Sequence, residues 1–247
     1  MTILSVNMNV PALLRNRRGH PWPDVLGLAR IALSAGAEGL TLHPRQDERH
    51  ATPEDARLFR KLIDDEFPGR ELNVEGYPDA RFLALVEEVR PDQVSLVPDG
   101  PEQATSDHGW DFHESTGFLR PIVARLKRQG LRVALFADAV PSEMEHAAET
   151  GADRVELYTG PYGAAHSDTK EAKRQADLLA NTATAATRAG LGVNAGHDLT
   201  VPGTRYLLSI VPDIAEVSIG HALSCDALTY GFRESVRRYL EACKAQA

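Results

Sequence analysis

Ionisable residues stand at the ends of short apolar segments in this chain. In GVNAGHDLT (192–200) an apolar run gives way to His197 and Asp198, and in LNVEG (72–76) the carboxylate of Glu75 ends the run. A group at the end of a buried segment is partly removed from water, which shifts its pKa. Groups of this kind are suited to general acid–base chemistry. For Glu75 the alternative is a structural pair with a nearby arginine.

Polar residues recur at the end of every expected strand. A lone histidine in such a place is more often structural or exposed than catalytic. Eight such ends are more informative, because the carboxyl ends of the strands in a parallel barrel form one rim where active sites lie. The residues are Asn7, Asn9, His43, Arg45, His50, Glu75, Thr105, Asp138, Glu156, Thr159, Asn194, His197, Gly220 and His221.

Two segments indicate phosphate binding. SIGHALSCD (218–226) places Gly220 and His221 between a strand and a helix start, where backbone N–H groups bind anions. LLRNRRG (13–19) carries three arginines and, together with a neighbouring loop, predicts a second phosphate pocket. A solvated basic surface is the alternative for these arginines. The residues of the predicted second pocket are Arg15, Arg17, Arg18, Arg45 and His50.

The lysines and histidines limit the chemistry. Every lysine falls in an expected helix and none ends a strand, which disfavours a Schiff base formed by the protein. Carbonyl–amine chemistry would then need an amine carried by the substrate. The histidines form no H-x-H or H-x-x-x-H pair, so no metal site is expected.

Apolar runs alternate with helical patterns eight times. This order and the length of 247 residues predict a (β/α)₈ TIM barrel in a single domain, residues 1–247. A doubly wound open sheet is the alternative, but no G-x-G-x-x-G follows the first strand. The strands read as continuous apolar runs, typical of parallel strands covered on both faces. Strands are expected at 3–8, 39–43, 71–76, 93–98, 132–138, 154–160, 192–197 and 216–222, and helices at 23–37, 52–67, 79–89, 118–130, 141–152, 169–188, 203–210 and 225–246.

Local signals refine this order. Thr52 is expected to cap the helix that follows it. AGAEGL, TGADRV and RAGLGV place glycines where helices can end in a left-handed turn. The longest segment without an expected element, 99–117, predicts a lid or binding loop.

Composition excludes several classes of protein. The net charge of −8 argues against binding of nucleic acid or anionic membranes. No apolar run reaches the ~18 residues of a membrane span. The two cysteines form neither a disulfide framework nor a four-ligand zinc site. The first residues, MTILSVNMNV, lack the pattern of a secretion signal, so a cytoplasmic protein is expected.

Several segments, in order along nearly the whole chain, resemble the pyridoxine 5′-phosphate synthase family. They are SVNMN, LLRNRRG, GLTLHPRQDERH, LNVEG, SLVPD, TSDHG, RVELYTGPY, GVNAGHDLT and EVSIGHAL. The resemblance implies a barrel with extra helices, assembled as a homo-octamer, and no metal or organic cofactor. It implies a transferase-class, ring-closing condensation of 1-deoxy-D-xylulose 5-phosphate with 3-amino-1-hydroxyacetone 1-phosphate. The products would be pyridoxine 5′-phosphate, phosphate and water.

The resemblance also implies roles for individual residues. His43 and Glu75 would be proton acceptors and His197 a proton donor. The phosphate of the aminoketone would contact Asn7, Gly220 and His221. The deoxyxylulose phosphate would be held by Arg18, Arg45, His50 and Thr105.

The chain departs from the family pattern at two places. Many members carry Asp-His where this chain has Asn9 and Val10, so a contact there is weakened for Asn9 and in doubt for Val10. Asp198 stands where Gly is common, and it is kept as a candidate substrate-binding residue. Capping of the next helix, or a role in loop structure, is favoured over catalysis for Asp198.

Two other functions stay open. One is another phosphosugar-acting barrel enzyme, such as an isomerase or a metal-dependent aldolase. The other is a barrel that binds phosphorylated metabolites without catalysis, its chemistry lost through the changed first loop.

Overall fold

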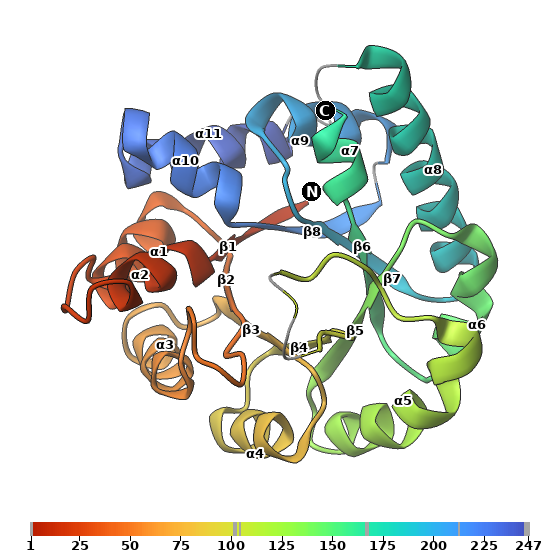
Figure 1. Ribbon diagram of the computed structural model, residues 1–247, viewed down its shortest axis with the longest axis horizontal. Coiled ribbons are helices and arrows are strands. Elements are labelled where there is room, and N and C mark those ends of the chain that lie inside the picture. The colour runs from red at the N-terminus through yellow and green to blue at the C-terminus, as the bar shows by residue number, and fades with distance from the viewer. Residues whose placement is uncertain (1, 101–102, 104, 166–167, 212, 245–247) are drawn as a thin grey trace.

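The computed structural model describes residues 2–100, 103, 105–165, 168–211 and 213–244. Eight parallel strands follow one another in chain order and close into a barrel, which confirms the predicted (β/α)₈ fold (Figure 1). The strands are β1 (Ile3–Asn7), β2 (Gly39–Leu42), β3 (Glu71–Gly76), β4 (Gln93–Leu96), β5 (Arg132–Ala137), β6 (Arg154–Tyr158), β7 (Gly192–Gly196) and β8 (Ile214–Ile219).

Helices surround the barrel on its outer side (Figure 1). They are α1 (Asn9–Asn16), α2 (Val25–Ala35), α3 (Pro53–Glu66), α4 (Ala80–Val89), α5 (Phe112–Lys127), α6 (Met144–Glu149), α7 (Gly160–Ala164), α8 (Thr169–Arg188), α9 (Val201–Ile210), α10 (His221–Tyr230) and α11 (Phe232–Lys244). A short 3₁₀ turn, Pro141–Glu143, precedes α6. Within the described residues, no helix has the length and apolar content needed to cross a membrane.

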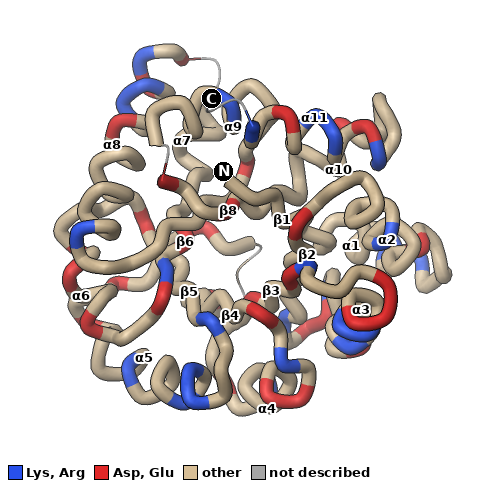
Figure 2. The backbone as a smooth tube through the Cα atoms, turned by 180° about the vertical axis from the view of Figure 1, so that it is seen from behind, with Lys and Arg blue, Asp and Glu red and all other residues tan. Residues whose placement is uncertain are grey.

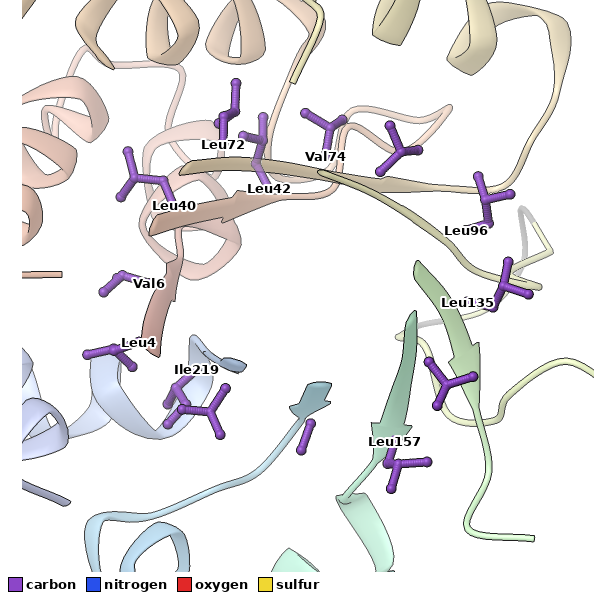
Figure 3. Packing of buried hydrophobic residues seen from close by; sticks show 14 of the residues in the cluster. Leu4, Val6, Leu40, Leu42, Leu72, Val74, Leu96, Leu135, Leu157 and Ile219 are labelled. Carbon is purple, nitrogen blue, oxygen red and sulfur yellow. The ribbon is translucent and has the colours of Figure 1, made fainter. Parts of the chain in front are cut away.

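The expectation of continuous apolar runs holds for β5, which is apolar from Val133 to Ala137, and is wrong for β1 and β4, where apolar and polar side chains alternate. Leu4 and Val6 of β1 belong to the hydrophobic core, whereas Ser5 between them bonds Thr41 inside the barrel. Figure 3 shows the labelled leucines, valines and isoleucine pointing outward from the ring of strands. Burial of each such side chain contributes about 1.5–3 kcal/mol. The main apolar core therefore lies between strands and helices.

Hydrogen bonds satisfy the polar residues inside the barrel. Ser95 donates to Asn73 (3.1 Å) and to Glu156 (3.3 Å). Deeper in the barrel, the Glu216 carboxylate accepts from Asn194 (3.2 Å) and lies 3.4 Å from Arg154. Because a buried polar group without a partner costs about 1–3 kcal/mol, these contacts are needed for a polar interior to be stable.

Replacing Glu216 with Gln should flatten the dependence of stability on pH. Burial raises the pKa of Glu216 to about 7. A carboxyl whose pKa is higher in the folded state than in the unfolded state stabilises the fold at pH values below its pKa in the unfolded state. This stabilisation is lost as the pH rises towards 7. The melting temperature of Glu216→Gln, measured between pH 5 and 8, should therefore rise relative to wild type as pH increases. The exposed Glu145→Gln variant is the control, and an unchanged difference across that range would contradict the prediction.

The structure also corrects several expected elements. A helix, α1, occupies the expected first loop, and α7 follows β6 directly. Helix α5 begins at Phe112, which shortens the loop expected over 99–117. The expected helix 225–246 is divided by Gly231 into α10 and α11.

The expected helix ends agree with the structure. The Thr52 side chain accepts a hydrogen bond from the backbone N–H of Asp55, and the Asp55 side chain accepts one from the backbone N–H of Thr52. The two bonds form a capping box. Gly36, Gly151 and Gly190 have φ values of 116°, 83° and 87°, in the left-handed region predicted for the helix-to-strand joints.

Charged residues of both signs are interspersed over the outer helices (Figure 2). Several arginines pair with a glutamate of an adjacent helix, and each exposed pair contributes only about 0–1 kcal/mol. These pairs are Arg30–Glu66 (2.7 Å), Arg57–Glu88 (2.7 Å) and Arg125–Glu87 (2.6 Å).

Candidate active site

A cavity of about 370 Å³ opens at the carboxyl ends of the strands. It brings together predicted residues from β1, β3, β7, β8 and the loops after β2 and β4, which agrees with the expectation of a shared rim. The lining residues are Asn7, Asn9, Val10, Leu13, His50, Glu75, Thr105, Ser106, Glu156, Tyr158, His197, Asp198, Ser218, Gly220 and His221.

Glu75 is buried at the mouth of the barrel, with 7 % of its surface exposed. Among the described residues, its carboxylate contacts no arginine, so the alternative of a structural ion pair is not borne out. Asn7 lies 3.5 Å from Oε2 of Glu75, at the limit of a hydrogen bond. Burial, followed by repulsion from Glu156 and Asp99, raises the pKa of Glu75 well above its usual value. A carboxylate in this environment is a strong base once ionised.

His197 packs against two aromatic rings that also contact each other. The centroids of Phe136 and Tyr158 lie 5.2 and 5.3 Å from the imidazole, and the Tyr158 contact is edge-on. Burial lowers the pKa of His197, while the charge of Asp198 acts in the opposite direction. The imidazole is thus fixed in orientation and sensitive to a neighbouring carboxylate.

Thr159 fixes the backbone that carries His197. The Thr159 side chain is fully buried, and its hydroxyl donates to the carbonyl oxygen of Gly196 (2.6 Å) and to that of His197. These contacts attach the start of α7 to the end of β7. Thr159 was expected at the rim, and its observed contacts are with this backbone instead.

Replacing Thr159 with Val should loosen this attachment. The variant keeps the shape of the side chain but leaves buried carbonyl groups with fewer donors, at an expected cost of about 1–3 kcal/mol. We expect a lower melting temperature and a lower kcat, because His197 would lose its fixed position. Thermal unfolding and steady-state kinetics measure the two effects. Thr159→Ser retains the hydroxyl and should keep the melting temperature and kcat of wild type. If Thr159→Ser lost as much of either as Thr159→Val, the role of the hydroxyl would be contradicted.

His43 lies next to His50 and is not among the residues that line the cavity. The two ring centroids are 5.8 Å apart. Burial, aided by the charges of His50 and Arg45, holds the pKa of His43 well below its usual range. Burial also lowers the pKa of His50 to about 4. Both imidazoles are therefore neutral at pH 7 and able to accept a proton.

Arg45 is buried in an internal ion pair beside the cavity. Nη1 of Arg45 lies 2.5 Å from Asp99, and Nη2 donates to the carbonyl oxygens of Gly100 (3.1 Å) and Gln103 (2.9 Å). Arg45, which was predicted to bind phosphate, thus holds the loop after β4 in place. These bonds use three of the five N–H donors of Arg45, and Arg45 is not among the residues that line the cavity.

The arginines of the first segment point to different places. Arg15 forms two hydrogen bonds with the Asp55 carboxylate (2.6 and 2.8 Å), so it is part of a structural ion pair. Arg18 is exposed in the turn after α1 and does not line the cavity. The structure therefore does not bring Arg18 and Arg45 together with His50 in one cavity.

The first loop connects to the second strand through Asn9. Oδ1 of Asn9 accepts from the backbone N–H of His43 (2.9 Å), and the backbone N–H of Asn9 donates to Asn7 (3.0 Å). Val10 lines the cavity but offers it only apolar atoms. Next to Asn7, α10 begins at His221 directly after Gly220, so its first N–H groups are available to an anion.

Asp198 does not cap the next helix. Thr200 performs this function, because its side chain accepts from the backbone N–H of Gly203 (3.2 Å). Of the two roles favoured for Asp198, capping of α9 was therefore wrong, and a role in loop structure stays a prediction. The Asp198 residue is exposed and lines the cavity beside His197.

Tyr158 is a cavity residue that the sequence did not single out. It follows Glu156 by two positions on β6, so both side chains face the barrel interior. The alternation of side chains in RVELY was the signal that could have identified it. Within the described residues, no group of three or more His, Cys, Asp or Glu side chains could hold a metal ion.

Comparisons with known proteins show which family this chain is similar to. The family model "Pyridoxal phosphate biosynthesis protein PdxJ" matches residues 4–245. The chain is 59 % identical to pyridoxine 5′-phosphate synthase of Mesorhizobium japonicum, covering 97 % of this chain and 98 % of that protein. It is 57 % identical to the enzyme of the same name from Rhizobium meliloti, covering 97 % of each.

Solved structures of low sequence identity share the fold. One is the YdjI aldolase of Escherichia coli, with a TM-score of 0.63, 10 % identity and coverage of 98 % of this chain and 89 % of that one. Another is phosphoribosylanthranilate isomerase of Thermotoga maritima, with a TM-score of 0.57, 12 % identity and coverage of 99 % of each. These two likenesses extend to the barrel alone. On the match over nearly its whole length and the identity to its relatives, the chain belongs to the PdxJ family of pyridoxal phosphate biosynthesis proteins.

Proposed function

We propose that this chain is a pyridoxine 5′-phosphate synthase and that the cavity at the barrel mouth is its active site. The reaction is the condensation of 1-deoxy-D-xylulose 5-phosphate with 3-amino-1-hydroxyacetone 1-phosphate to pyridoxine 5′-phosphate, phosphate and water. The observation that carries the proposal is the buried Glu75 carboxylate, which shares one cavity with the imidazole of His197. Ring closure requires repeated proton removal from carbon and protonation of departing oxygen, and this pair supplies both kinds of group.

Glu75 and His43 are the proposed proton acceptors and His197 the proposed donor. Glu75 and His197 reach substrate directly, because both line the cavity. His43 lies one ring further back, so a proton bound for it would pass through His50 or follow a movement of that ring. Both histidines are neutral at pH 7, which is the form that accepts a proton, but their lowered pKa values make them weak bases.

Two phosphate subsites complete the proposal. Asn7, Gly220 and His221 would hold the aminoketone phosphate at the start of α10, where N–H groups favour an anion. His50 and Thr105 line the cavity on the side proposed for the deoxyxylulose phosphate. Arg45 and Arg18 would join that subsite only by rearranging. Binding two phosphates in one cavity would orient the reacting groups, which lowers the entropic part of the barrier.

The proposal extends to assembly and location. We propose a homo-octamer, as the family resemblance implies, and a cytoplasmic protein. Exposed apolar side chains support assembly: Trp22 is 64 % exposed and Leu228 is 84 % exposed. No metal or organic cofactor is included, because the substrate brings the amine that forms the imine.

Kinetic assays of the purified protein test this function. Product should form only when both phosphorylated substrates are present, and a metal chelator should leave the rate unchanged. Turnover of one substrate alone, or loss of activity with the chelator, would instead indicate an isomerase or a metal-dependent aldolase. Tight binding of both substrates without turnover would indicate a non-catalytic binding protein.

A further inference from the structure

Tyr158 stands where two cavities meet. Its side chain lines the active-site cavity, and it also lines a second cavity of about 310 Å³ beside α7 and α8. The second cavity is bordered by Asp138, Val140, Pro161 and Leu178, among others. Open space on two sides gives the ring room to change rotamer, because close packing is what normally holds a side chain in one arrangement. The position of Tyr158 therefore depends on few contacts.

The hydroxyl of Tyr158 does not fix this position. Within the part of the chain that the structure describes, no hydrogen bond engages that hydroxyl. Tyr162 of α7 differs in this respect, because its hydroxyl donates to the carbonyl oxygen of Gly203 (2.9 Å). The ring of Tyr158 must be held by packing instead.

Two neighbouring rings pack against Tyr158. The centroid of Phe136 lies 5.6 Å from that of Tyr158, and the imidazole of His197 lies 5.3 Å from it, edge-on. Phe136 also lies 5.2 Å from His197, so each ring contacts the other two. Phe136 is 1 % exposed and is not among the residues that line either cavity, which makes it the fixed support of the three. The orientation of the imidazole therefore depends on where the Tyr158 ring lies.

Gly160 leaves the space that the Tyr158 ring occupies. A Cβ atom on Gly160 would overlap the hydroxyl oxygen and the ring of Tyr158. The backbone does not require glycine here, because the φ of Gly160 lies outside the left-handed region. Since the overlap falls on the far end of a side chain with room to move, a residue with a Cβ atom would displace the ring and leave the fold intact. Glycine at this position therefore serves the placement of Tyr158.

We propose that Tyr158 is a positioning residue for His197, and that position 160 is glycine so that the Tyr158 ring can hold the imidazole in line with the substrate. This inference rests on the proposed function, in which His197 donates a proton. The donor must lie within hydrogen-bond reach of the oxygen that it protonates. A misplacement of about 1 Å lowers a rate by about 10²-fold. A displaced Tyr158 ring would release the imidazole, while the groups proposed to bind the phosphates would stay in place.

Replacing Gly160 with Ala tests this inference without changing an ionisable group. We expect kcat to fall about 10- to 100-fold and KM for each substrate to stay within about twofold, because the loss falls on the transition state. The melting temperature should equal that of wild type or exceed it, since alanine favours a helix more than glycine does. A wild-type kcat in Gly160→Ala, or a loss seen only as a higher KM, would overturn the inference.

Gly117→Ala is the matched control. Gly117 also lies in a helix, α5, but a Cβ atom there would meet open space. This variant should match wild type in kcat, KM and melting temperature.

Changes at Tyr158 separate its ring from its hydroxyl. Tyr158→Leu removes the ring and should lower kcat at least as much as Gly160→Ala, whereas Tyr158→Phe keeps the ring and should recover most of that loss. Because Leu leaves room for a Cβ atom at position 160, adding Gly160→Ala to Tyr158→Leu should change kcat by less than about twofold. A second loss as large as the first would show that Gly160 acts independently of Tyr158 and would overturn the inference. A Tyr158→Phe variant as slow as Tyr158→Leu would overturn it as well.

Crystal structures of wild type and Gly160→Ala make the test independent of catalysis. In the variant the Tyr158 ring should leave its wild-type position, and the imidazole of His197 should lose its wild-type orientation. If either ring stayed where it is in wild type, the inference would be overturned. Absence of product from wild type, with both rings displaced in Gly160→Ala, would instead refute only the proposed function.

Discussion

Replacing Glu75 with Gln is expected to lower kcat by about 10²- to 10⁴-fold, the usual contribution of a positioned general base. Gln matches the size of Glu but cannot accept the proton. The fold should survive, because ionising a buried carboxyl with a raised pKa opposes folding, and Gln removes that cost. Steady-state kinetics and thermal unfolding measure the two effects, and the melting temperature at pH 7.5 should be unchanged or higher.

The pH profile provides a second test of Glu75. A proton acceptor must be ionised, so kcat/KM of wild type should fall as pH drops below the raised pKa of Glu75. This acidic limb should lie at higher pH than the ordinary value near 4.5. Glu145→Gln alters an exposed carboxyl and serves as the control. Normal turnover of Glu75→Gln would refute the assignment of Glu75 as the base.

Replacing His197 with Asn is expected to lower kcat by about 10²- to 10⁴-fold. Asn tolerates the left-handed backbone at this position, where φ is 83°, so the turn should be retained. It cannot donate a proton as an imidazolium does. Rates should be measured from pH 5 to 9, with binding of the substrates followed by calorimetry to separate catalysis from recognition.

The expected direction of the pH effect follows from the burial of His197. Burial lowers its pKa, so in wild type the protonated donor is lost as pH rises, and this loss should set the alkaline limb of the profile. Asn should remove that limb. The negative charges of bound phosphates would raise the pKa of His197 and increase the protonated fraction. An alkaline limb that persists unchanged in His197→Asn would contradict the assignment of His197 as the donor.

The sequence predicted the barrel because helix and strand signals repeat locally. The helix cap at Thr52 and the left-handed glycines at helix ends depend on neighbours a few residues away, and the structure confirms both predictions. The shared rim also followed from sequence, since strand ends of a parallel barrel meet on one side. Glu75 and His197 therefore met in one cavity as expected.

The partners of charged side chains could not be predicted in the same way. Arg45 pairs with Asp99 and Arg15 with Asp55, residues 54 and 40 positions away. Such partners are set by how the loops fold over the rim. The polar side chains inside the barrel were not predicted, because the strands were expected to be continuous apolar runs. The alternation of side chains along a strand was the available signal, and it would have placed Tyr158 in the cavity.

The departures from the family pattern gained a physical description from the structure. Asn9 joins the first loop to the second strand through the backbone of His43, a contact that requires an acceptor oxygen but no charge. Asp198 follows a turn that glycine would satisfy, and its carboxylate faces the cavity.

The most direct test of the account is the joint measurement of both products. The purified protein is incubated with both phosphorylated substrates, and pyridoxine 5′-phosphate is followed by its absorbance and mass while inorganic phosphate is followed in parallel. The account predicts one phosphate released for each pyridoxine 5′-phosphate formed, with neither product from Glu75→Gln at a comparable rate. Phosphate release without the pyridine product, or no reaction in wild type with both substrates bound, would contradict it.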